Sequence, residues 1–406
     1  MRKTFKYRIY PTKAMEKKLF FVLNRCRELY NAALSERRDA YKYAKKSVTY
    51  NQQANDLPEI KHEIRPEYEE IASHVLQDVL KRLDKAFQNF FRRIKEGQTP
   101  GYPRFQGRNR YDSFTYPDIA GWKLPESERP LLEKKARNVK LTLSKMGSIT
   151  LRLHRPLEGT IKTVTIKRDV DQWFVCFSCE LVELEKLPVS YEEVGIDLGV
   201  SHLATLSNGE MIEHPRYYRK AKKTLEQRQQ ALSRKKRGSH RRDRARKLVA
   251  RAHRKVRNQR QDYHHKASRS LVNRYQLLVF EDIQTINLVR KPKSKQDAET
   301  GQYLPNGAAA KGGLNKSILD AGWGSFVAMC SYKAACASRI LIKVDPKYTS
   351  QICSRCGTGR KKTLEERWHS CDCGAELDRD VNAAVNILVR GKQQLLAWNV
   401  PTSAMA

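Results

Sequence analysis

The chain has 406 residues, with 79 lysines and arginines against 44 aspartates and glutamates, which gives a formal net charge of +35 at pH 7. Self-repulsion at this charge opposes compaction, which argues against an enzyme of small neutral metabolites. No apolar run approaches the ~18 residues of a membrane span, and the N-terminus lacks the apolar stretch of a signal peptide. We therefore expect a cytoplasmic protein of roughly two to three domains whose partner is a polyanion, with nucleic acid as the first candidate and no membrane partner.

The first half of the chain predicts an antiparallel β-barrel or sandwich that is interrupted by helices. Residues 2–10 alternate basic and apolar side chains, as a strand does, and Pro11 ends the pattern. Residues 14–97 show the apolar spacing of helices. Four further short strands are predicted, at 139–143, 148–153, 161–166 and 173–181. We expect strand 2–10 to join them, which makes the helical block an insertion.

The second half predicts an α/β domain. After a boundary near Pro188, residues 194–214 read as three short strands with Gly and Asn-Gly turns. A long helical stretch over 216–274 follows and is broken at Gly238 and Ser239 into a hairpin. The remaining predictions are a strand at 276–281, a flexible polar loop at 291–313, a helix at 323–338, a strand at 340–344 and a helix at 381–396. The order βββ-α-β-α-β follows, and no internal repeat is evident.

The helical stretch 216–274 concentrates the positive charge. It holds 23 basic and 3 acidic residues. A solvated helical face is the plain alternative, but repulsion this dense is costly unless a partner supplies counter-charge. The residues that we expect to contact nucleic acid are Arg234, Lys235, Lys236, Arg237, Arg241, Arg242, Arg254, Arg257 and Arg260.

Three carboxylates stand out by their context. Asp197 lies in an apolar strand, where an unpaired charge costs several kcal/mol. Glu281 ends an apolar run, and Asp380 lies at the start of a helix. Asp378 and Asp380 have a simpler reading as helix caps. If the domain folds as predicted, the three can converge, and such hard oxygen ligands suit Mg²⁺ or Mn²⁺ in a phosphodiester displacement.

The cysteines predict a second metal site. Cys353, Cys356, Cys371 and Cys373 form a CxxC…CxC pattern with 14 residues between the pairs. Two such knuckles can deliver four thiolates to a structural Zn²⁺, with His369 as a possible substitute ligand. An odd number of cysteines without an export signal favours metal over disulfides. The other cysteines read as small buried hydrophobes; they are Cys26, Cys176, Cys179, Cys330 and Cys336.

Together these motifs resemble the TnpB family, formerly called OrfB, of insertion-sequence transposons, which is related to type V CRISPR effectors. The resemblance covers nearly the whole chain. It rests on residues 7–11 (YRIYP), 101–105 (GYPRF), 195–200 (GIDLGV), 260–262 (RQD), 280–283 (FEDI), 320–324 (DAGWG), 348–353 (YTSQIC), the second cysteine pair and 378–384 (DRDVNAA).

The resemblance implies a RuvC-like nuclease domain of RNase H fold at 191–348 and 375–396, with a zinc-binding insertion at 349–374 and a tail at 397–406. It implies a β-barrel wedge domain at 1–13 and 113–190, and a helical recognition lobe at 14–112. Asp197, Glu281 and Asp380 would be the metal-binding catalytic acids, with Asn382 supporting the helix start or the site. Tyr50, Gln77, Thr115 and Tyr116 look similar to the residues that read the target-adjacent motif.

The implied activity is that of an RNA-guided DNA endonuclease, in which a guide RNA from a transposon end pairs with double-stranded target DNA. A protein oligomer is not implied, and such a protein would be prokaryotic and nucleoid-associated when bound to DNA. The alternatives are a nuclease-inactive RNA-guided repressor, an accessory protein or transposase acting in transposition, and a basic RNA-packaging protein. Because RNA would relieve the self-repulsion, we expect the RNA-free protein to be markedly less stable.

Overall fold

A computed structural model describes residues 2–108, 110–124, 137–181, 187–363 and 366–399. The chain divides into two compact units, Met1–Glu183 and Leu184–Ala406, so the division lies a few residues before the predicted boundary near Pro188. In the part of the chain that the structure describes, no helix combines the length and apolar character needed to cross a membrane.

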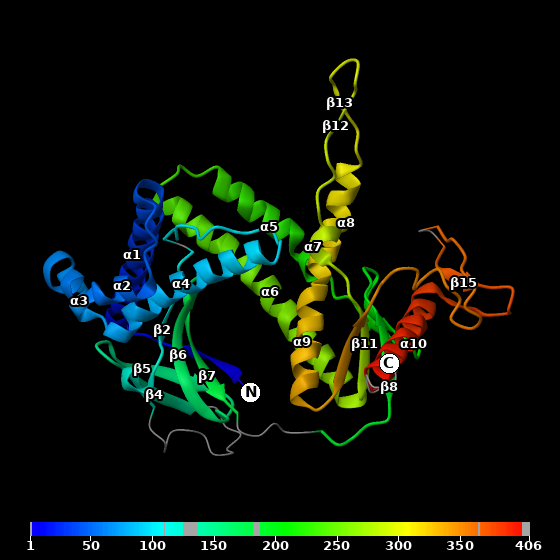
Figure 1. Cartoon of the computed structure of the whole chain (residues 1–406), viewed down its shortest axis with the longest axis horizontal. Coiled ribbons are helices and arrows are strands. Elements are labelled where there is room, and N and C mark those ends of the chain that lie inside the picture. The colour runs from blue at the N-terminus through cyan, green and yellow to red at the C-terminus, as the bar shows by residue number, and fades with distance from the viewer. Residues whose placement is uncertain (1, 109, 125–136, 182–186, 364–365, 400–406) are drawn as a thin grey trace. The chain divides into compact units, whose positions relative to one another are not determined.

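The first unit contains a seven-stranded antiparallel sheet that forms a nearly closed β-barrel (Figure 1). Its strands in chain order are β1 Arg2–Ile9, β2 Ser113–Tyr116, β3 Trp122–Lys123, β4 Arg137–Leu143, β5 Gly147–Leu153, β6 Thr160–Asp169 and β7 Gln172–Glu180. Strand β1 lies between β7 and β5, with Phe5 opposite Phe177. This confirms that the N-terminal strand joins strands more than 100 residues away.

Helices interrupt this sheet between β1 and β2, as the sequence predicts. They are α1 Lys13–Ala44, α2 Tyr50–Asn55, α3 Leu57–Glu59, a π-turn at Ile60–Ile64, a 3₁₀ turn at Pro66–Glu70 and α4 Ser73–Lys95. Their apolar faces and the inward side chains of the barrel form one continuous core, in which Leu19 and Leu76 are fully buried. The barrel and the helical block therefore share a core.

The second unit is built on a five-stranded mixed sheet. Its strands are β8 Glu193–Asp197, β9 His202–Leu206, β10 Met211–Glu213, β11 Leu277–Glu281 and β14 Ile340–Val344, in the spatial order β10-β9-β8-β11-β14. The first three form the predicted antiparallel meander, whereas β11 runs parallel to both β8 and β14. Parallel strands bring their carboxyl ends to one edge of a sheet.

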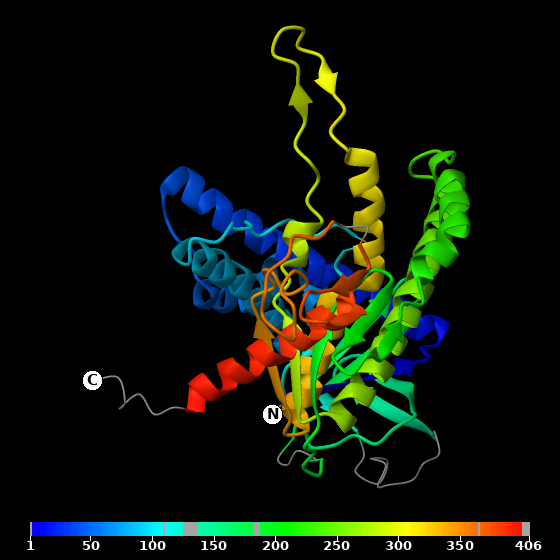
Figure 2. The ribbon, with the colours of Figure 1, turned by 90° about the vertical axis from the view of Figure 1, so that its right-hand side faces the viewer.

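Helices cover both faces of this second sheet (Figure 2). The helices of this unit are α5 Tyr217–Ser233, α6 His240–Arg274, α7 Thr285–Leu288, α8 Ala308–Ala321, α9 Trp323–Cys336 and α10 Arg379–Asn399, of which α6, α9 and α10 pack on the sheet. Side chains alternate along β11, so that Leu278 and Phe280 pack with residues of α6 and α9, and Leu277 and Val279 pack with Ile387 of α10. The sheet is thus the middle of three layers.

Three sequence predictions need correction here. The predicted loop at 291–313 contains a short hairpin, β12 Lys295–Gln296 and β13 Tyr303–Leu304, and α8 already begins at Ala308 because the alanines there favour helix. Cys176 and Cys336 are half-buried, unlike the other three isolated cysteines. Residues 397–399 of the predicted tail belong to α10, and 400–406 lie outside the described residues.

Candidate active site and metal centre

Two of the three predicted carboxylates end neighbouring parallel strands. Asp197 is the last residue of β8 and Glu281 is the last residue of β11, and the residues just before them, Ile196 and Phe280, are register partners. The two carboxylates therefore lie at the same edge of the sheet, where open α/β sheets bind their ligands.

Helix α10 brings the third carboxylate to this edge because two glycines let it approach the sheet. A Cβ atom at Gly195 would lie 2.0 Å from the carbonyl oxygen of Ala384, and one at Gly391 would lie 2.4 Å from Cγ2 of Val279. Neither position has room for a side chain, so α10 packs directly on β8 and β11. Asp380 stands one turn before Ala384, next to the end of β8.

The structure separates the roles of the two aspartates at the start of α10. The Asp378 carboxylate accepts hydrogen bonds from the backbone N–H groups of Asp380 and Val381, at 2.8 and 3.3 Å. Asp378 is therefore the cap of the helix. The Asp380 side chain is free of this task and forms an ion pair with Arg379 at 3.6 Å.

Asp197 feels the negative charge of both other carboxylates. Burial raises the pKa of Asp197 well above its ordinary value, and the charges of Glu281 and Asp380 raise it further, against a smaller lowering by Arg379. Burial also raises the pKa of Glu281, which is 9% exposed. Such a cluster favours a bound cation, which would offset the repulsion. In the described residues the carboxylates do not yet form a tight ligand group.

The four predicted cysteines do form such a group. Their sulfur atoms all lie within 4.8 Å of one another, with Cys353 Sγ 3.7 Å from Cys373 Sγ and Cys356 Sγ 3.5 Å from Cys371 Sγ. None of the four is in a disulfide. Sulfurs around a tetrahedral Zn²⁺ stand about 3.8 Å apart, given Zn–S bonds of about 2.3 Å. The four thiols can therefore hold one metal ion.

His369 is not part of this group, which corrects the sequence alternative. It is buried on the short strand β15, Trp368–Ser370, which pairs with β16, Glu376–Asp378. The Lys362 ammonium donates to its Nδ1 atom. The histidine thus packs beside the cysteines without joining them.

Asparagines on α10 fasten the first cysteine pair to the helix that carries Asp380. The buried Asn382 accepts from the N–H of Ser354 at 2.9 Å and donates to the carbonyl of Ile352 at 2.8 Å. Asn386 donates to the carbonyls of Ile352 and Thr349, at 2.7 and 2.9 Å. Sequence reasoning anticipated a supporting role for Asn382 but missed Asn386, which repeats the amide one turn later.

Thr349 was also missed. It is buried, and its hydroxyl donates to a Glu281 carboxylate oxygen at 2.5 Å. This hydrogen bond lowers the pKa of Glu281 against the effect of burial. The only signal in the sequence is its place four residues before Cys353.

The residues that are predicted to contact nucleic acid differ in their exposure and in their partners. Four of them form the exposed turn between α5 and α6, and Arg241 and Arg257 are exposed on α6; the turn residues are Arg234, Lys235, Lys236 and Arg237. Arg254 is half-buried. Arg242 instead closes the turn by donating to the carbonyls of Leu232 and Lys235, and Arg260 is paired with Asp320 at 3.0 Å. These two arginines have structural partners, and their contact with nucleic acid stays a prediction.

The residues expected to read a DNA motif differ in exposure. Gln77 is exposed and Tyr50 is half-buried. Tyr116 is 2% exposed and its hydroxyl donates to the carbonyl of Ser144, so the expectation that its ring reaches a base is wrong in this structure. The Thr115 hydroxyl accepts from Arg82 at 2.5 Å and shares a hydrogen bond with Thr165.

Comparison with known proteins identifies the family. A protein of Streptomyces pristinaespiralis named "Putative RNA-guided DNA endonuclease" is 35% identical over 398 residues, 96% of this chain and 90% of the relative. InsQ of Escherichia coli K12, with the same description, is 31% identical over 95% of this chain and 92% of the relative. The chain belongs to the TnpB (OrfB) family.

Three family models match parts of the chain. Residues 176–291 match OrfB_IS605, "Probable transposase", and 323–387 match the Cas12f1-like TNB domain, which spans the four cysteines. Residues 1–46 match a model described as a helix-turn-helix domain, whereas here they form β1 and the single helix α1.

A solved structure, that of the mini-RNA-guided endonuclease CRISPR-Cas_phi3, resembles the chain in fold. It has a TM-score of 0.50 at 9% identity, over 96% of this chain and 92% of that one. The neighbour supports the α/β architecture of this TnpB-family chain.

Proposed function

We propose that this TnpB-family protein is an RNA-guided DNA endonuclease whose active site for cutting phosphodiester bonds consists of Asp197, Glu281 and Asp380. What supports the proposal is the position of these carboxylates at two neighbouring strand ends and at the start of the helix packed on those strands, in a chain with relatives of that name over nearly its whole length. The order of the strands in the second unit supports a RuvC-like domain of RNase H fold for residues 191–348 and 375–396.

The donor set fits Mg²⁺ or Mn²⁺, because it consists of hard carboxylate oxygens whose mutual repulsion a divalent cation relieves. A bound cation would stabilise charge on the phosphate and lower the pKa of an attacking water. Asp197 and Glu281 would hold it from the sheet edge, and Asp380 would hold it from α10. The Thr349 hydroxyl would orient the Glu281 carboxylate, and its hydrogen bond lowers the pKa of that carboxylate against the effect of burial.

We further propose that Cys353, Cys356, Cys371 and Cys373 hold a structural Zn²⁺ in the insertion 349–374. The four-sulfur donor set supports zinc over harder cations, and these four cysteines would supply all of its ligands. Through Asn382 and Asn386 the bound ion would stiffen the segment beside α10. Its role would be to support the catalytic acids rather than to take part in cleavage.

Guide RNA and double-stranded target DNA are the proposed partners, with the RNA derived from a transposon end. The exposed basic turn Arg234–Arg237 and the positive helices α5 and α6 support this, since they supply backbone contacts that do not depend on sequence. The barrel at 1–13 and 113–190 would be the wedge domain and 14–112 the recognition lobe, although they share a core. Gln77 is the best exposed of the candidate motif-reading residues.

The experiment that tests this function is to sequence the RNA that copurifies with the chain and to programme it against a target. The complex is then incubated with Mg²⁺ and a plasmid library in which the sequence flanking the target is random. Cleavage of a subset of flanks, dependent on RNA and lost in Asp197→Ala, is expected. An intact library with bound RNA would instead favour an RNA-guided repressor.

A second candidate is a transposase that joins DNA ends, which the description "Probable transposase" of the matching family model favours. Strand transfer would leave covalently joined products, whereas the nuclease leaves free ends. Sequencing the products of the same reaction separates the two activities.

A further inference from the structure

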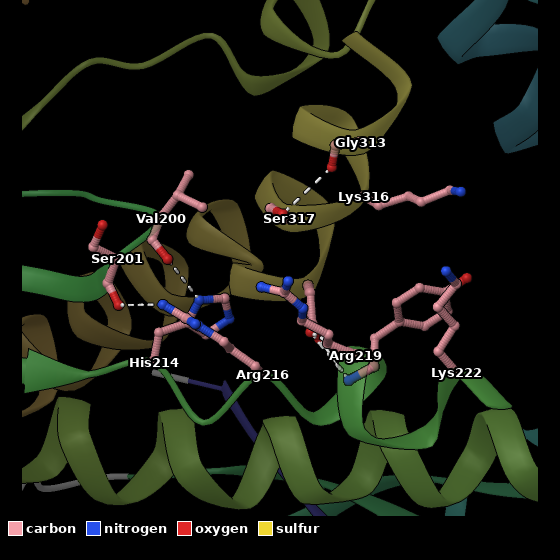
Figure 3. Close-up of a pocket in the computed structure, with 11 residues that line it drawn as sticks. Val200, Ser201, His214, Arg216, Arg219, Lys222, Gly313, Lys316 and Ser317 are labelled. Carbon is pink, nitrogen blue, oxygen red and sulfur yellow. Dashed lines mark hydrogen bonds between the residues drawn. The ribbon is translucent and has the colours of Figure 1, made fainter. Parts of the chain in front are cut away.

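The second unit contains a cavity of about 430 Å³ that is separate from the three carboxylates. It lies between the end of the meander, the start of α5 and the middle of α8 (Figure 3). This volume falls within the range of small-ligand sites. The cavity is lined by the loop between β8 and β9, by the residues that lead into α5, by α5 and by α8. Parts of the chain that are distant in sequence therefore build it.

Positive charge dominates the lining. Arg216, Arg219, Lys222 and Lys316 all contribute to it. Arg219 and Lys316 have no carboxylate partner among the described residues, while Lys222 lies 3.7 Å from Glu226 in an exposed pair. Figure 3 shows Lys316 extending from α8 and Lys222 from α5. The cavity therefore favours an anionic ligand.

The one acid in the lining is already neutralised. Asp320 is 6% exposed, and its carboxylate accepts from the N–H groups of Tyr218 and Arg219 at the start of α5, at 3.0 and 3.2 Å. It also pairs with Arg260 at 3.0 Å. Asp320 thus fixes the start of α5 and holds Arg260 in place, and its charge does not cancel those of the free cations.

The cavity is also lined by a buried histidine whose ring offers a hydrogen-bond acceptor, which a simple anion without a donor group cannot satisfy. His214 is 8% exposed, and its Nδ1 lies 3.1 Å from the carbonyl oxygen of Val200, as Figure 3 shows. A carbonyl can only accept, so Nδ1 carries the hydrogen and Nε2 of the neutral ring is an acceptor. Nε2 is buried and has no hydrogen-bond partner in the described chain. Buried polar atoms of this kind are normally satisfied by the protein, by ordered water or by a ligand, so Nε2 is an acceptor that a donor group in the cavity could use.

We propose that this cavity holds one ribonucleotide of the bound RNA, with one flanking phosphate at Arg219, the other at Lys316, and the ribose 2′-hydroxyl donating to Nε2 of His214. An RNA backbone offers an anion and a neighbouring donor, whereas the DNA backbone lacks the donor. The pocket would thus make the protein select RNA over DNA as its guide. The inference rests on the proposed function, since it takes RNA as the partner.

The test maps the 2′-hydroxyls that binding requires. The copurifying RNA is transcribed again with 2′-deoxynucleotides placed at random, bound to the full chain, and sequenced in bound and free fractions. We expect a position where the 2′-deoxy substitution weakens binding about fivefold, the loss of one hydrogen bond. With the His214→Ala variant, the 2′-deoxy substitution at that position should no longer weaken binding.

A second comparison uses surface variants, so it does not require that the protein still folds when the buried His214 is replaced. Lys316 is exposed, and Lys311 lies on the same helix outside the cavity. Lys316→Ala should weaken binding of the unmodified RNA about fivefold and lower the salt slope by about 0.7, as for one phosphate contact, with little change in Lys311→Ala.

Three results would overturn the proposal. They are the absence of any His214-dependent 2′-hydroxyl, an equal loss of affinity for a DNA copy of the same sequence in His214→Ala, and equal effects of Lys316→Ala and Lys311→Ala. Cleavage by the wild-type chain with unmodified RNA is measured in parallel. If the wild-type chain cleaves DNA while the pocket test fails, the assignment of the pocket is wrong and the proposed endonuclease function is unaffected.

Discussion

The hydroxyl of Thr349 donates a hydrogen bond of 2.5 Å to the carboxylate of Glu281. This contact ties the end of β11 to the segment that leads into the first cysteine pair. The same segment is held by Asn386 through the Thr349 carbonyl. One residue thus links a proposed catalytic acid, through its side chain, to the segment of the proposed metal centre and, through its carbonyl, to the helix that carries Asp380.

Replacing Thr349 with Val should impair cleavage through Glu281. Val keeps the shape of Thr but loses the donor, so the pKa of Glu281 should rise further, since hydrogen bonds to the ionised form lower it. The acidic limb of the pH–rate profile should move to higher pH, with about a tenfold lower rate near neutrality. Thr349→Ser keeps the hydroxyl and is the control. An unshifted profile in Thr349→Val would show that Glu281 does not depend on this contact.

Asp197→Asn should stabilise the metal-free protein. The pKa of Asp197 is higher in the folded protein than in the unfolded chain, so folding is favoured at low pH, and this stability is lost as pH rises through the folded-state pKa. Asn cannot ionise, so at pH 8 without metal the Asp197→Asn variant should have a higher melting temperature than the wild type. The increase should be about 2–4 °C for each kcal/mol by which the variant is more stable. The difference should vanish near pH 4. A lower melting temperature at pH 8 would contradict the repulsive cluster.

Gly195→Ala should destabilise the second unit because its Cβ would meet the Ala384 carbonyl at 2.0 Å. Overpacking of this kind costs about 1–3 kcal/mol, and moving α10 away from β8 would displace Asp380. We expect a lower melting temperature and weaker cleavage. Gly312→Ala is the matched control, since no atom lies within 4 Å of its Cβ position and Ala favours helix. Equal melting temperatures for the two variants would refute the close packing.

Removal of the cysteine-bound metal should lower stability and then activity. Elemental analysis of the purified chain should find one zinc, and Cys371→Ser should abolish it, because three remaining thiolates leave an incomplete site. The melting temperature and the cleavage rate should both fall. Cys176→Ser, in the other unit and half-buried, should retain the zinc. Full zinc occupancy in Cys371→Ser would contradict the four-cysteine site.

Much of this architecture could be predicted because it depends on short-range patterns. The alternation in residues 2–10, the Gly turns of the meander and the CxxC…CxC spacing each correspond to a feature of the structure. Asp197 and Glu281 could be predicted as neighbours because both end apolar strands. The choice between Asp378 and Asp380 came from the family resemblance, and the structure supplies its physical reason in the capping bonds of Asp378.

The remaining features depend on contacts that no local pattern encodes. Thr349 and Asn386 meet their partners only because the segment after β14 folds back over α10. Tyr116 was expected at the surface, but β2 turns Phe114 and Tyr116 into the barrel and Thr115 outward. Arg260 is one of many basic residues in its segment, and nothing local indicates its ion pair with Asp320, which lies 60 positions away in the sequence.

The most direct test of the account compares two adjacent carboxylates that differ only in their place at the start of α10. Asp380→Asn removes a proposed metal ligand, whereas Asp378→Asn removes the same charge but keeps the cap, since Asn caps helices as well as Asp. With guide RNA, Mg²⁺ and a matched target, Asp380→Asn should cut roughly 100-fold or more slowly, and Asp378→Asn should cut at close to the wild-type rate. Equal cleavage by Asp380→Asn and the wild type would contradict the three-carboxylate site.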